Sequence, residues 1–278
     1  MSKVWFITGA GSGIGAGTAR AALKAGNRVV ASGRNLDKVR NALRDVAGEN
    51  LALVQLDVSK EAQAKAAVDE AVKRFGRIDV LVNNAGYSTL GIFEATTSAE
   101  LERQFATNFY GVANVMRAVL PVMRRQRSGH IVNISSVAGV VGLKHCSAYG
   151  ASKFAVEGLS LAVAEEVGQF GIQVTLVEPG FFRTGLLDPR HVRWAKSSIE
   201  DYAAEGDPEK MWSPYHGTQP NDPDKLGDAL VKIAAMEAPP QIFVAGSDAL
   251  ETITPVVEKR LKTMRDHAEL SRSSGGVS

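Results

Sequence analysis

The chain has 278 residues, of which 45% are hydrophobic and 22% are charged, and its formal net charge at pH 7 is +2. This near-neutral, apolar-rich composition excludes a disordered chain and gives no electrostatic footprint for nucleic acid. The single cysteine, Cys146, excludes an internal disulfide framework and a thiolate metal cluster, and no run of about 18 apolar residues predicts a membrane span, so we expect a cytoplasmic protein that acts on small molecules without a metal.

The chain opens with a glycine-rich turn between a predicted strand, residues 3–8, and a predicted helix, residues 16–25. Glycines allow close approach of the backbone to a phosphate, and the free N–H groups at a helix start face an anion. We therefore predict a pyrophosphate-binding turn, with a plain structural turn as the alternative. Its residues are Gly9, Ser12, Gly13, Ile14 and Gly15.

Strands then alternate with helices at the spacing of βαβ units. The predicted strands are 28–32, 51–56 and 79–82, and the predicted helices are 36–46 and 60–75. This alternation predicts an α/β fold, a single doubly wound parallel sheet of Rossmann type with helices on both faces and its ligand over the carboxyl ends of the strands. Asp57, Asn83 and Gly86 lie at such ends, although Asp57 is equally typical of a helix cap or turn.

The second predicted strand ends at Gly33, where many dinucleotide-binding folds carry an acid. A carboxylate at this place binds the adenosine ribose and would repel a 2′-phosphate. Here Arg34 follows directly, and its guanidinium can pair with a phosphate. We predict NADP(H) as the cofactor in preference to NAD(H), with Asp37 as a competitor for Arg34. The alternative is an Arg34 that simply ends the strand in solvent.

A long helix is predicted from Thr97, which starts a capping box, to about residue 127. Asn108 and Gly111 interrupt its apolar face, and a buried amide there needs a partner or a function. A kink with a satisfied core asparagine is the plain interpretation. The next strand, 131–136, brings Ser136 to the carboxyl edge of the sheet.

Tyr149 and Lys153 stand four residues apart at the start of a helix predicted over 148–170. Side chains at this spacing share one helix face, and an ammonium beside a phenol favours the phenolate and lowers its pKa from about 10. With Ser136 holding a carbonyl or alcohol oxygen, the pair could act as an acid/base site. The same spacing is also typical of an amphipathic rim with a lysine that reaches toward solvent.

The regular alternation lapses after a strand at 173–177. Residues 181–221 contain two tryptophans and two tyrosines among four prolines, which predicts short helices and loops rather than a sheet. We interpret 186–221 as a substrate-covering insertion in a single domain of residues 1–270. A helix at 222–235, a strand at 241–244 and a helix at 250–267 follow, and 271–278 is predicted to be a flexible tail.

These motifs together resemble the short-chain dehydrogenase/reductase family in its shorter, unextended branch. The residues that carry the resemblance are Thr8, Gly9, Gly13 and Gly15, Asp57, the run 83–86, Asn108, Ser136, Tyr149, Lys153, and Pro179-Gly180 with Thr184. The resemblance covers residues 3–185. It implies an oxidoreductase that moves hydride between a nicotinamide cofactor and a carbonyl or secondary alcohol.

The resemblance also implies roles for single residues. Tyr149 would be the acid/base, Lys153 would lower its pKa and hold the nicotinamide ribose, Ser136 would bind the reacting oxygen, and Asn108 would complete a catalytic tetrad. Gly9, Ser12, Gly13, Ile14 and Gly15 would contact the cofactor phosphates. Asp57, Asn83 and Gly86 would lie beside adenine and ribose, and Gly180 and Thr184 at the carboxamide.

Alternatives remain at this stage. The longer epimerase and dehydratase branch also has the Tyr149 and Lys153 spacing but differs in its glycine turn, and a regulatory protein of this fold could bind the cofactor without turnover. His145 could touch the substrate, and Arg183 could contact a phosphate or carboxylate. The apolar-rich helices 98–127 and 148–170 predict a homodimer or homotetramer.

Overall fold

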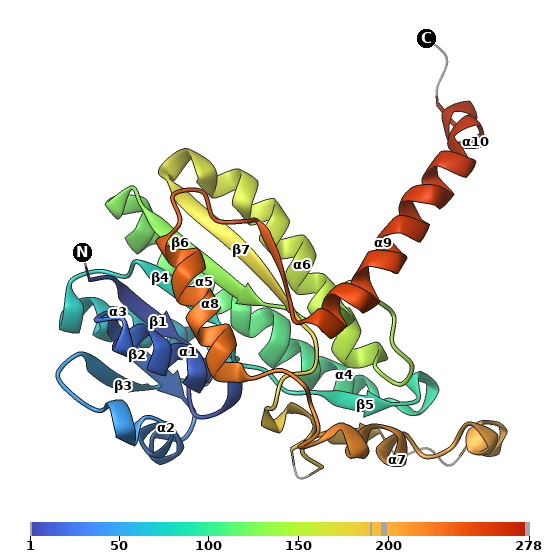
Figure 1. Ribbon diagram of the computed structural model, residues 1–278, viewed down its shortest axis with the longest axis horizontal. Coiled ribbons are helices and arrows are strands. Elements are labelled where there is room, and N and C mark those ends of the chain that lie inside the picture. Colours follow the sequence, from blue (N-terminus) through green and yellow to red (C-terminus); the bar gives the residue numbers. More distant parts are fainter. Residues whose placement is uncertain (1, 190, 196–198, 276–278) are drawn as a thin grey trace.

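A seven-stranded parallel sheet forms the centre of the protein (Figure 1). The computed structural model describes residues 2–189, 191–195 and 199–275. Neighbouring strands follow the order β3-β2-β1-β4-β6-β7-β9. The direction in which successive strands are added therefore reverses between β1 and β4, as in a doubly wound fold. The strands are β1 (Val4–Ile7), β2 (Arg28–Gly33), β3 (Leu51–Gln55), β4 (Val80–Asn83), β6 (Gly129–Ile134), β7 (Ile172–Pro179) and β9 (Ile242–Ala245).

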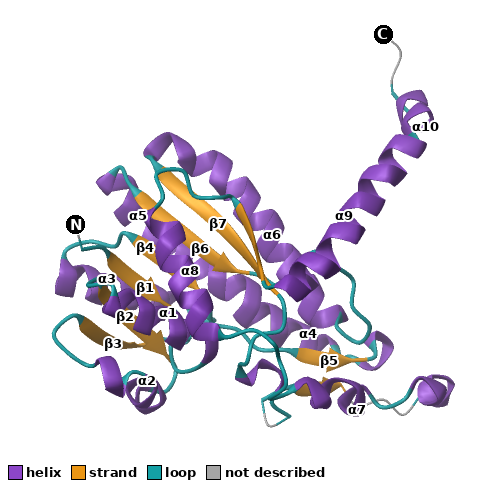
Figure 2. Cartoon of the chain, viewed as in Figure 1, coloured by secondary structure: helices purple, strands orange, loops and turns teal. Residues whose placement is uncertain are grey.

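Helices cover both faces of this sheet (Figure 2). One face packs against α1 (Gly13–Lys24), α2 (Leu36–Ala42) and α8 (Pro223–Ala235), and the other against α3 (Glu61–Phe75), α5 (Gly111–Gln126) and α6 (Ser147–Val167). The predicted α/β fold with a doubly wound parallel sheet is confirmed.

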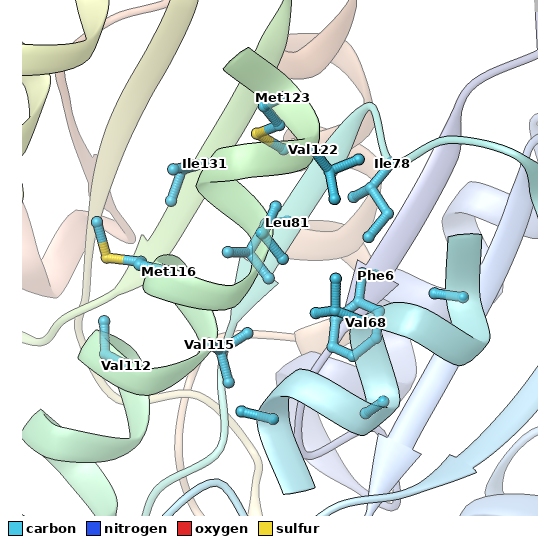
Figure 3. Packing of buried hydrophobic residues seen from close by; sticks show 14 of the residues in the cluster. Phe6, Val68, Ile78, Leu81, Val112, Val115, Met116, Val122, Met123 and Ile131 are labelled. Atoms are coloured by element: carbon cyan, nitrogen blue, oxygen red, sulfur yellow. The ribbon is translucent and has the colours of Figure 1, made fainter. Parts of the chain in front are cut away.

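The two cores follow from side-chain alternation along the strands. Phe6, Leu81 and Ile131 point toward α3 and α5 (Figure 3), whereas Trp5 and Val80 point to the opposite face. Because both faces of a parallel sheet are buried, its strands read as continuous apolar runs rather than as alternating patterns. Full burial of one large apolar side chain contributes about 1.5–3 kcal/mol, so these strands hold the layers together.

The predicted long helix is interrupted where Asn108 lies. It consists of α4 (Ser98–Phe105), a π-helical turn (Ala106–Tyr110) and α5. The capping box predicted at Thr97 is present, with Glu100 as its reciprocal partner. A π-turn widens the backbone ring by one residue, so the α-helical hydrogen-bond pattern changes at Asn108, and the expected kink stays a prediction.

Two predicted segments differ from the structure. The helix expected over 36–46 ends at Ala42 and is followed by a separate short 3₁₀ turn, Arg44–Val46. The segment 181–221 was expected to contain no sheet, yet β8 (Arg193–Ala195) pairs in parallel with β5 (Thr89–Gly91). These strands have three residues each, too short for a two-residue periodicity to be recognised in sequence.

The carboxyl-terminal part is more helical than expected. After α9 (Ser247–Asp266) comes α10 (Ala268–Ser273), so the first residues of the predicted tail are helical, and residues 276–278 of that tail lie outside the described part of the chain.

The insertion adds the short helix α7 (Pro208–Trp212) and several 3₁₀ turns. Within the described residues, no helix combines the length and apolar character that a membrane crossing requires.

Candidate active site

The glycine turn joins β1 to α1 and leaves the first helical turn open. Ser12 is the N-cap residue in an extended conformation, and its side chain makes no capping hydrogen bond. Gly13 has φ +54°, and a Cβ atom there would lie 2.9 Å from the Cγ2 atom of Thr184. The free N–H groups, the uncommitted hydroxyl and the missing side chain together form a cradle that fits a phosphate group.

Asn84 braces this turn from the end of β4. Its backbone N–H donates to Thr8 Oγ1 at 2.9 Å, and its side-chain amide donates to the carbonyl oxygens of Thr8 and Gly9 at 3.0 and 3.2 Å. A Cβ atom on Gly15 would lie 2.4 Å from Asn84 Nδ2. Gly15 therefore allows the helix to pack on the brace and does not line the cavity.

The side chain of Asn83 points into the core and not toward the cavity. It is 3% exposed, and its side-chain amide donates to Asn133 Oδ1 at 2.8 Å inside the sheet. Asn84 and Gly86 line the cavity instead of the Asn83 side chain. Alternation along β4 thus turns the Asn83 side chain into the core, and the position of Asn83 beside adenine and ribose stays a prediction.

Ser136, Tyr149 and Lys153 meet beside this turn, at the carboxyl ends of β6 and β7. Ser136 caps a short 3₁₀ turn, accepting from the N–H of Ala138 at 3.1 Å, and Tyr149 and Lys153 lie on the first two turns of α6. All three line one cavity of about 1300 Å³ that also includes the glycine turn. Their arrangement brings a hydroxyl, a phenol and an amine to the same space.

Burial controls the protonation of Tyr149. Its side chain is 6% exposed, and burial raises its pKa to about 12, while a hydrogen bond with Ser136 opposes the rise. The Lys153 ammonium donates to the carbonyl oxygen of Ile134 at 2.7 Å and lies 5.8 Å from the centre of the Tyr149 ring. Burial has the largest effect on this pKa, so the phenol holds its proton at neutral pH, and the expected lowering by Lys153 stays a prediction.

The half-buried carboxyl group of Glu157 lies near Lys153, with the buried carboxyl group of Glu178 near Glu157, and no motif in the sequence indicated either. Glu157 is one helical turn beyond Lys153, and burial raises its pKa to about 7, with Ser135 and Lys153 opposing the rise. Glu178 on β7 is 4% exposed, and burial raises its pKa as well. Burial lowers the pKa of Lys153 to about 8, and the Glu157 charge opposes this. Each group in this cluster is thus shifted toward its neutral form.

Asn108 lies next to the site without lining the cavity. Its amide donates to the Tyr87 carbonyl oxygen at 3.0 Å and to Ser152 Oγ at 3.2 Å, and its carbonyl oxygen accepts from the Tyr87 N–H at 3.2 Å. It is fully buried on the π-turn. These bonds tie the long helix to the loop after β4 and to α6.

A positively charged rim lies where β2 and β3 end. Arg34, Asn35, Lys38 and Asp57 line this part of the cavity. Asp37 pairs with Arg40, so the predicted competition of Asp37 for Arg34 does not occur. Lys38 was not among the residues predicted for the site. A Cβ atom added to Gly11 would lie 3.2 Å from Lys38 Cγ, so this lysine is a second cation beside the glycine turn. Its position one turn into α2 could have suggested this.

Asp57 closes a local turn and also lines the cavity. Its Oδ1 accepts from Ser59 Oγ at 2.7 Å and from the Ser59 N–H at 3.0 Å, which closes a local turn. Its side chain still lines the cavity. Ile14, Gly86, Gly180 and Thr184 line the same cavity, with the Thr184 hydroxyl accepting from the Leu186 N–H at 3.2 Å.

Two further candidates do not line this cavity. Arg183 binds Asp222 at 3.0 Å and the carbonyl oxygens of Gln219 and Pro220 at 3.2 Å, so its predicted contact with a ligand anion is not supported. His145 has φ +61° and lines a separate hollow of about 510 Å³ with Phe93 and Tyr202. Its predicted substrate contact is not supported.

The insertion supplies an apolar wall facing Tyr149. Trp212, Leu187 and Val192 pack with Leu90, Cys146 and Tyr149 in one buried cluster. Phe181 stacks on Tyr215, with ring centroids 5.3 Å apart, and Trp212 lies 5.8 Å from Tyr215. Aromatic residues among prolines were the only sequence signal of this wall.

Two arginines also line the cavity beside Tyr87. They are Arg103 and Arg193, and their charges oppose the rise in Tyr87 pKa that burial causes. Among the described residues no group of three or more His, Cys, Asp or Glu side chains is placed to hold a metal ion.

Known proteins share this sequence and architecture. Residues 3–192 match the family model described as short chain dehydrogenase. The chain is 36% identical to "Oxidoreductase BOA17" of Botryotinia fuckeliana, over 99% of this chain and all of that one. It is 40% identical to "3-ketodihydrosphingosine reductase" of Bacteroides thetaiotaomicron over 86% of each chain. A short-chain dehydrogenase from Streptomyces avermitilis superposes with a TM-score of 0.89 at 34% identity, covering 99% of this chain and 100% of that one.

Similar solved structures contain nicotinamide cofactors. ElxO with NADP bound has a TM-score of 0.74 and 28% identity, covering 90% of this chain and 100% of that one. A protein from Burkholderia phymatum in complex with NAD has a TM-score of 0.80 and 25% identity, covering 100% of this chain and 98% of that one. A nicotinamide dinucleotide is therefore supported as the cofactor class, without a choice between the two forms.

Proposed function

The chain belongs to the short-chain dehydrogenase/reductase family of oxidoreductases, and we propose that it transfers hydride between NADP(H) and the carbonyl or secondary alcohol group of an apolar substrate. The observation that carries this proposal is one cavity in which the glycine turn, Ser136, Tyr149 and Lys153 come together. The family supplies the reaction class, and the residues around Tyr149 support the apolar substrate.

The cavity is suited to hold the dinucleotide along the carboxyl edge of the sheet. Ser12 and the first N–H groups of α1 would bind the phosphates, Asp57 and Gly86 would contact the adenosine, and Gly180 and Thr184 would lie near the carboxamide. Lys153 would reach the nicotinamide ribose. When bound, the cofactor would supply or accept the hydride.

The side chains of Tyr149 and Ser136 would carry out the proton transfer. The phenol of Tyr149, whose pKa burial raises, would donate its proton to the substrate oxygen during reduction, and Ser136 would hold that oxygen by a hydrogen bond. In the oxidative direction Tyr149 must first lose this proton, which requires an approaching positive charge. Lys153 could supply the charge by turning from the Ile134 carbonyl oxygen.

The substrate preference can be tested with a panel of carbonyl compounds. The wall of Leu90, Leu187, Trp212 and Val192 offers little to a hydroxyl-rich sugar, whereas it would bury an apolar chain or ring. With the purified enzyme and excess cofactor, consumption of the reduced nicotinamide should be faster with ketosteroids and acyl ketones, including 3-ketodihydrosphingosine, than with ketoses. Equal or faster turnover of ketoses would contradict the apolar preference, and no turnover of any ketone, aldehyde or quinone would count against the reaction class.

We expect NADP(H) to be preferred over NAD(H) for two reasons. Arg34 and Lys38 place two cations at the rim of the cavity, and the strand β2 contains no acidic residue that would repel a 2′-phosphate. A charge-assisted contact with the 2′-phosphate is worth about 1.5–3 kcal/mol, which corresponds to about 10- to 150-fold discrimination. The measurement is the ratio of kcat/KM for NADPH over NADH. Arg34→Ala should lower this ratio by about that factor and Lys38→Ala by less, because the lysine lacks the bidentate geometry.

The matched control is Arg44→Ala, which removes an exposed cation from the turn after α2 that does not line the cavity. This substitution should leave the ratio unchanged. A wild-type ratio at or below one, or a ratio that Arg34→Ala does not move, would refute the assignment of NADP(H).

The insertion 186–221 is proposed to cover the substrate within one catalytic domain of residues 1–270. In the described part of the insertion, Tyr202 donates to Glu94 at 3.0 Å and the three-residue strand β8 pairs with β5. Short helices and loops outside a central sheet open more easily than the core does. Limited proteolysis should cut this insertion in the ligand-free enzyme, and cofactor with substrate should slow the cleavage. Equal cleavage rates in both states would contradict a covering role.

We further propose a cytoplasmic homodimer or homotetramer. The lone cysteine suits a reducing compartment. Tyr110, Phe154 and Leu161 are 57%, 46% and 38% exposed on the long-helix side of the sheet, and exposed apolar side chains of this size favour association through these helices. The molar mass of the particle by light scattering checks this, since a species of 29.6 kDa alone at micromolar concentration would contradict it.

A further inference from the structure

The helix α9 leaves the body of the protein after its first two turns. At its foot, Ala249 and Ile253 are buried against Val137, with Val140 and Val141 packed around them. Beyond this foot, α9 and α10 project away from the sheet as an arm (Figure 1). At 1.5 Å per residue, the twenty residues of α9 span about 30 Å. The outer part of the arm therefore has no partner within the described chain that could bury it.

This arm carries an exposed apolar stripe. Leu250, Val257, Leu261 and Met264 are 53%, 51%, 45% and 63% exposed. Their spacings of seven, four and three residues place them on one side of a helix with 3.6 residues per turn. A projecting helix with such a stripe gains its stability from packing the stripe against another surface. Leu270, at 72% exposure, extends the apolar surface toward the arm's tip.

The charges of α9 are divided along its length. Its residues up to Glu258 include the acids Asp248, Glu251 and Glu258 and no lysine or arginine, whereas Lys259, Arg260, Lys262 and Arg265 follow within seven residues. Asp266 is the acid of that second half, and it pairs with Lys262. An antiparallel copy of the same helix would place the acidic half of one arm beside the basic half of the other.

We propose that the stripe is an isologous interface in which the arms of two copies of this chain pack antiparallel. A two-fold axis at Val257 would bring Val257 against the partner's Val257 and Leu250 against the partner's Met264, because both pairs are symmetric about that position. Glu251 would lie on the same flank as the partner's Arg265. This interface is separate from the faces of α5 and α6 and does not depend on the proposed reaction.

A membrane surface is the competing occupant of an amphipathic helix. An interfacial helix binds anionic lipid through a polar face rich in lysine and arginine. The acids in the first half of α9 oppose such binding, whereas they complete the pairing with a second copy. The division of charge thus favours a copy of this chain over lipid.

Cysteine cross-linking tests the geometry directly. The native Cys146 is 5% exposed, so an engineered thiol on the arm would react without background. Under mild oxidation of the full-length protein at micromolar concentration, Val257→Cys should form a disulfide-linked dimer. Lys259→Cys, on the opposite side of the helix, is the matched control and should cross-link at least about tenfold more slowly, because its Cα atoms would lie beyond the disulfide range of about 7 Å.

Charge reversal provides the second test. Glu251→Arg and Arg265→Glu should each slow cross-linking of Val257→Cys, and the two reversals together should restore it. Equal cross-linking at positions 257 and 259, or a double reversal that does not restore it, would overturn the proposal. Binding of the wild-type protein to vesicles of phosphatidylcholine and phosphatidylserine, lost in Val257→Asp, would overturn it as well. Circular dichroism confirms that each variant is folded.

Discussion

Tyr149→Phe is expected to lower kcat by at least about 10²-fold, the loss typical of removing a general acid. The phenol is buried, keeps its proton at neutral pH and lies within hydrogen-bonding reach of Ser136. Phenylalanine retains the ring that packs with Leu187 and Trp212, so the wall and the cofactor site should stay intact. Cofactor affinity, measured by fluorescence titration of the reduced nicotinamide, should therefore change little.

Tyr110→Phe is the matched control, since it removes a phenol hydroxyl from a surface residue that is 57% exposed. Its kcat should equal that of the wild type. If Tyr149→Phe keeps more than about a tenth of the wild-type activity, the loss is too small for a general acid, and Tyr149 is not the proton donor. The same result would leave hydride transfer possible with another donor, whereas a loss of cofactor binding would point to a structural defect.

Lys153→Ala is expected to damage turnover and cofactor binding together. The ammonium is 6% exposed and donates to the Ile134 carbonyl oxygen, so truncation leaves a cavity and a buried acceptor without a donor. An unsatisfied buried group costs about 1–3 kcal/mol of stability. Loss of a charge-assisted contact with the ribose should raise the cofactor Kd about 10- to 150-fold, and kcat should fall further because the positive charge near Tyr149 is gone.

Lys153→Met separates charge from packing. Methionine fills much of the same volume without a charge, so its Tm should lie closer to that of the wild type while its turnover remains as low as that of Lys153→Ala. If Lys153→Met recovers turnover, the lysine acts through packing alone. If Lys153→Ala weakens neither binding nor turnover, the amine is not part of the site.

Short-range patterns determined most of the fold and the centre of the site. The strand, glycine turn and helix at residues 3–25 depend on neighbours within a few positions, and so does the i, i+4 relation of Tyr149 and Lys153. Apolar strands that alternate with helices indicate a parallel sheet, in which the carboxyl ends of the strands lie at one edge. Ser136 could therefore be assigned to that edge from the sequence alone. These features were predictable because local geometry fixes them.

Side-chain direction at the strand ends was decided by tertiary structure. Asn83 and Asn84 are adjacent in sequence, yet one binds Asn133 in the core and the other braces the glycine turn. Successive side chains on a strand point to opposite faces, so an uncertainty of one residue in the strand boundary exchanges their roles. The identity of the residue that borders the ligand therefore required the pairing register.

The electrostatic surroundings of the site were also invisible in the sequence. Glu157 and Glu178 come from a helix and a strand that meet only in the folded protein, and their burial, not their spacing, shifts their pKa. Burial likewise has the largest effect on the pKa of Tyr149. Desolvation depends on every element packed around a group, whereas a motif records only the neighbours along the chain. The sequence thus determined which groups can react, and the tertiary structure decided their protonation and the surfaces that face them.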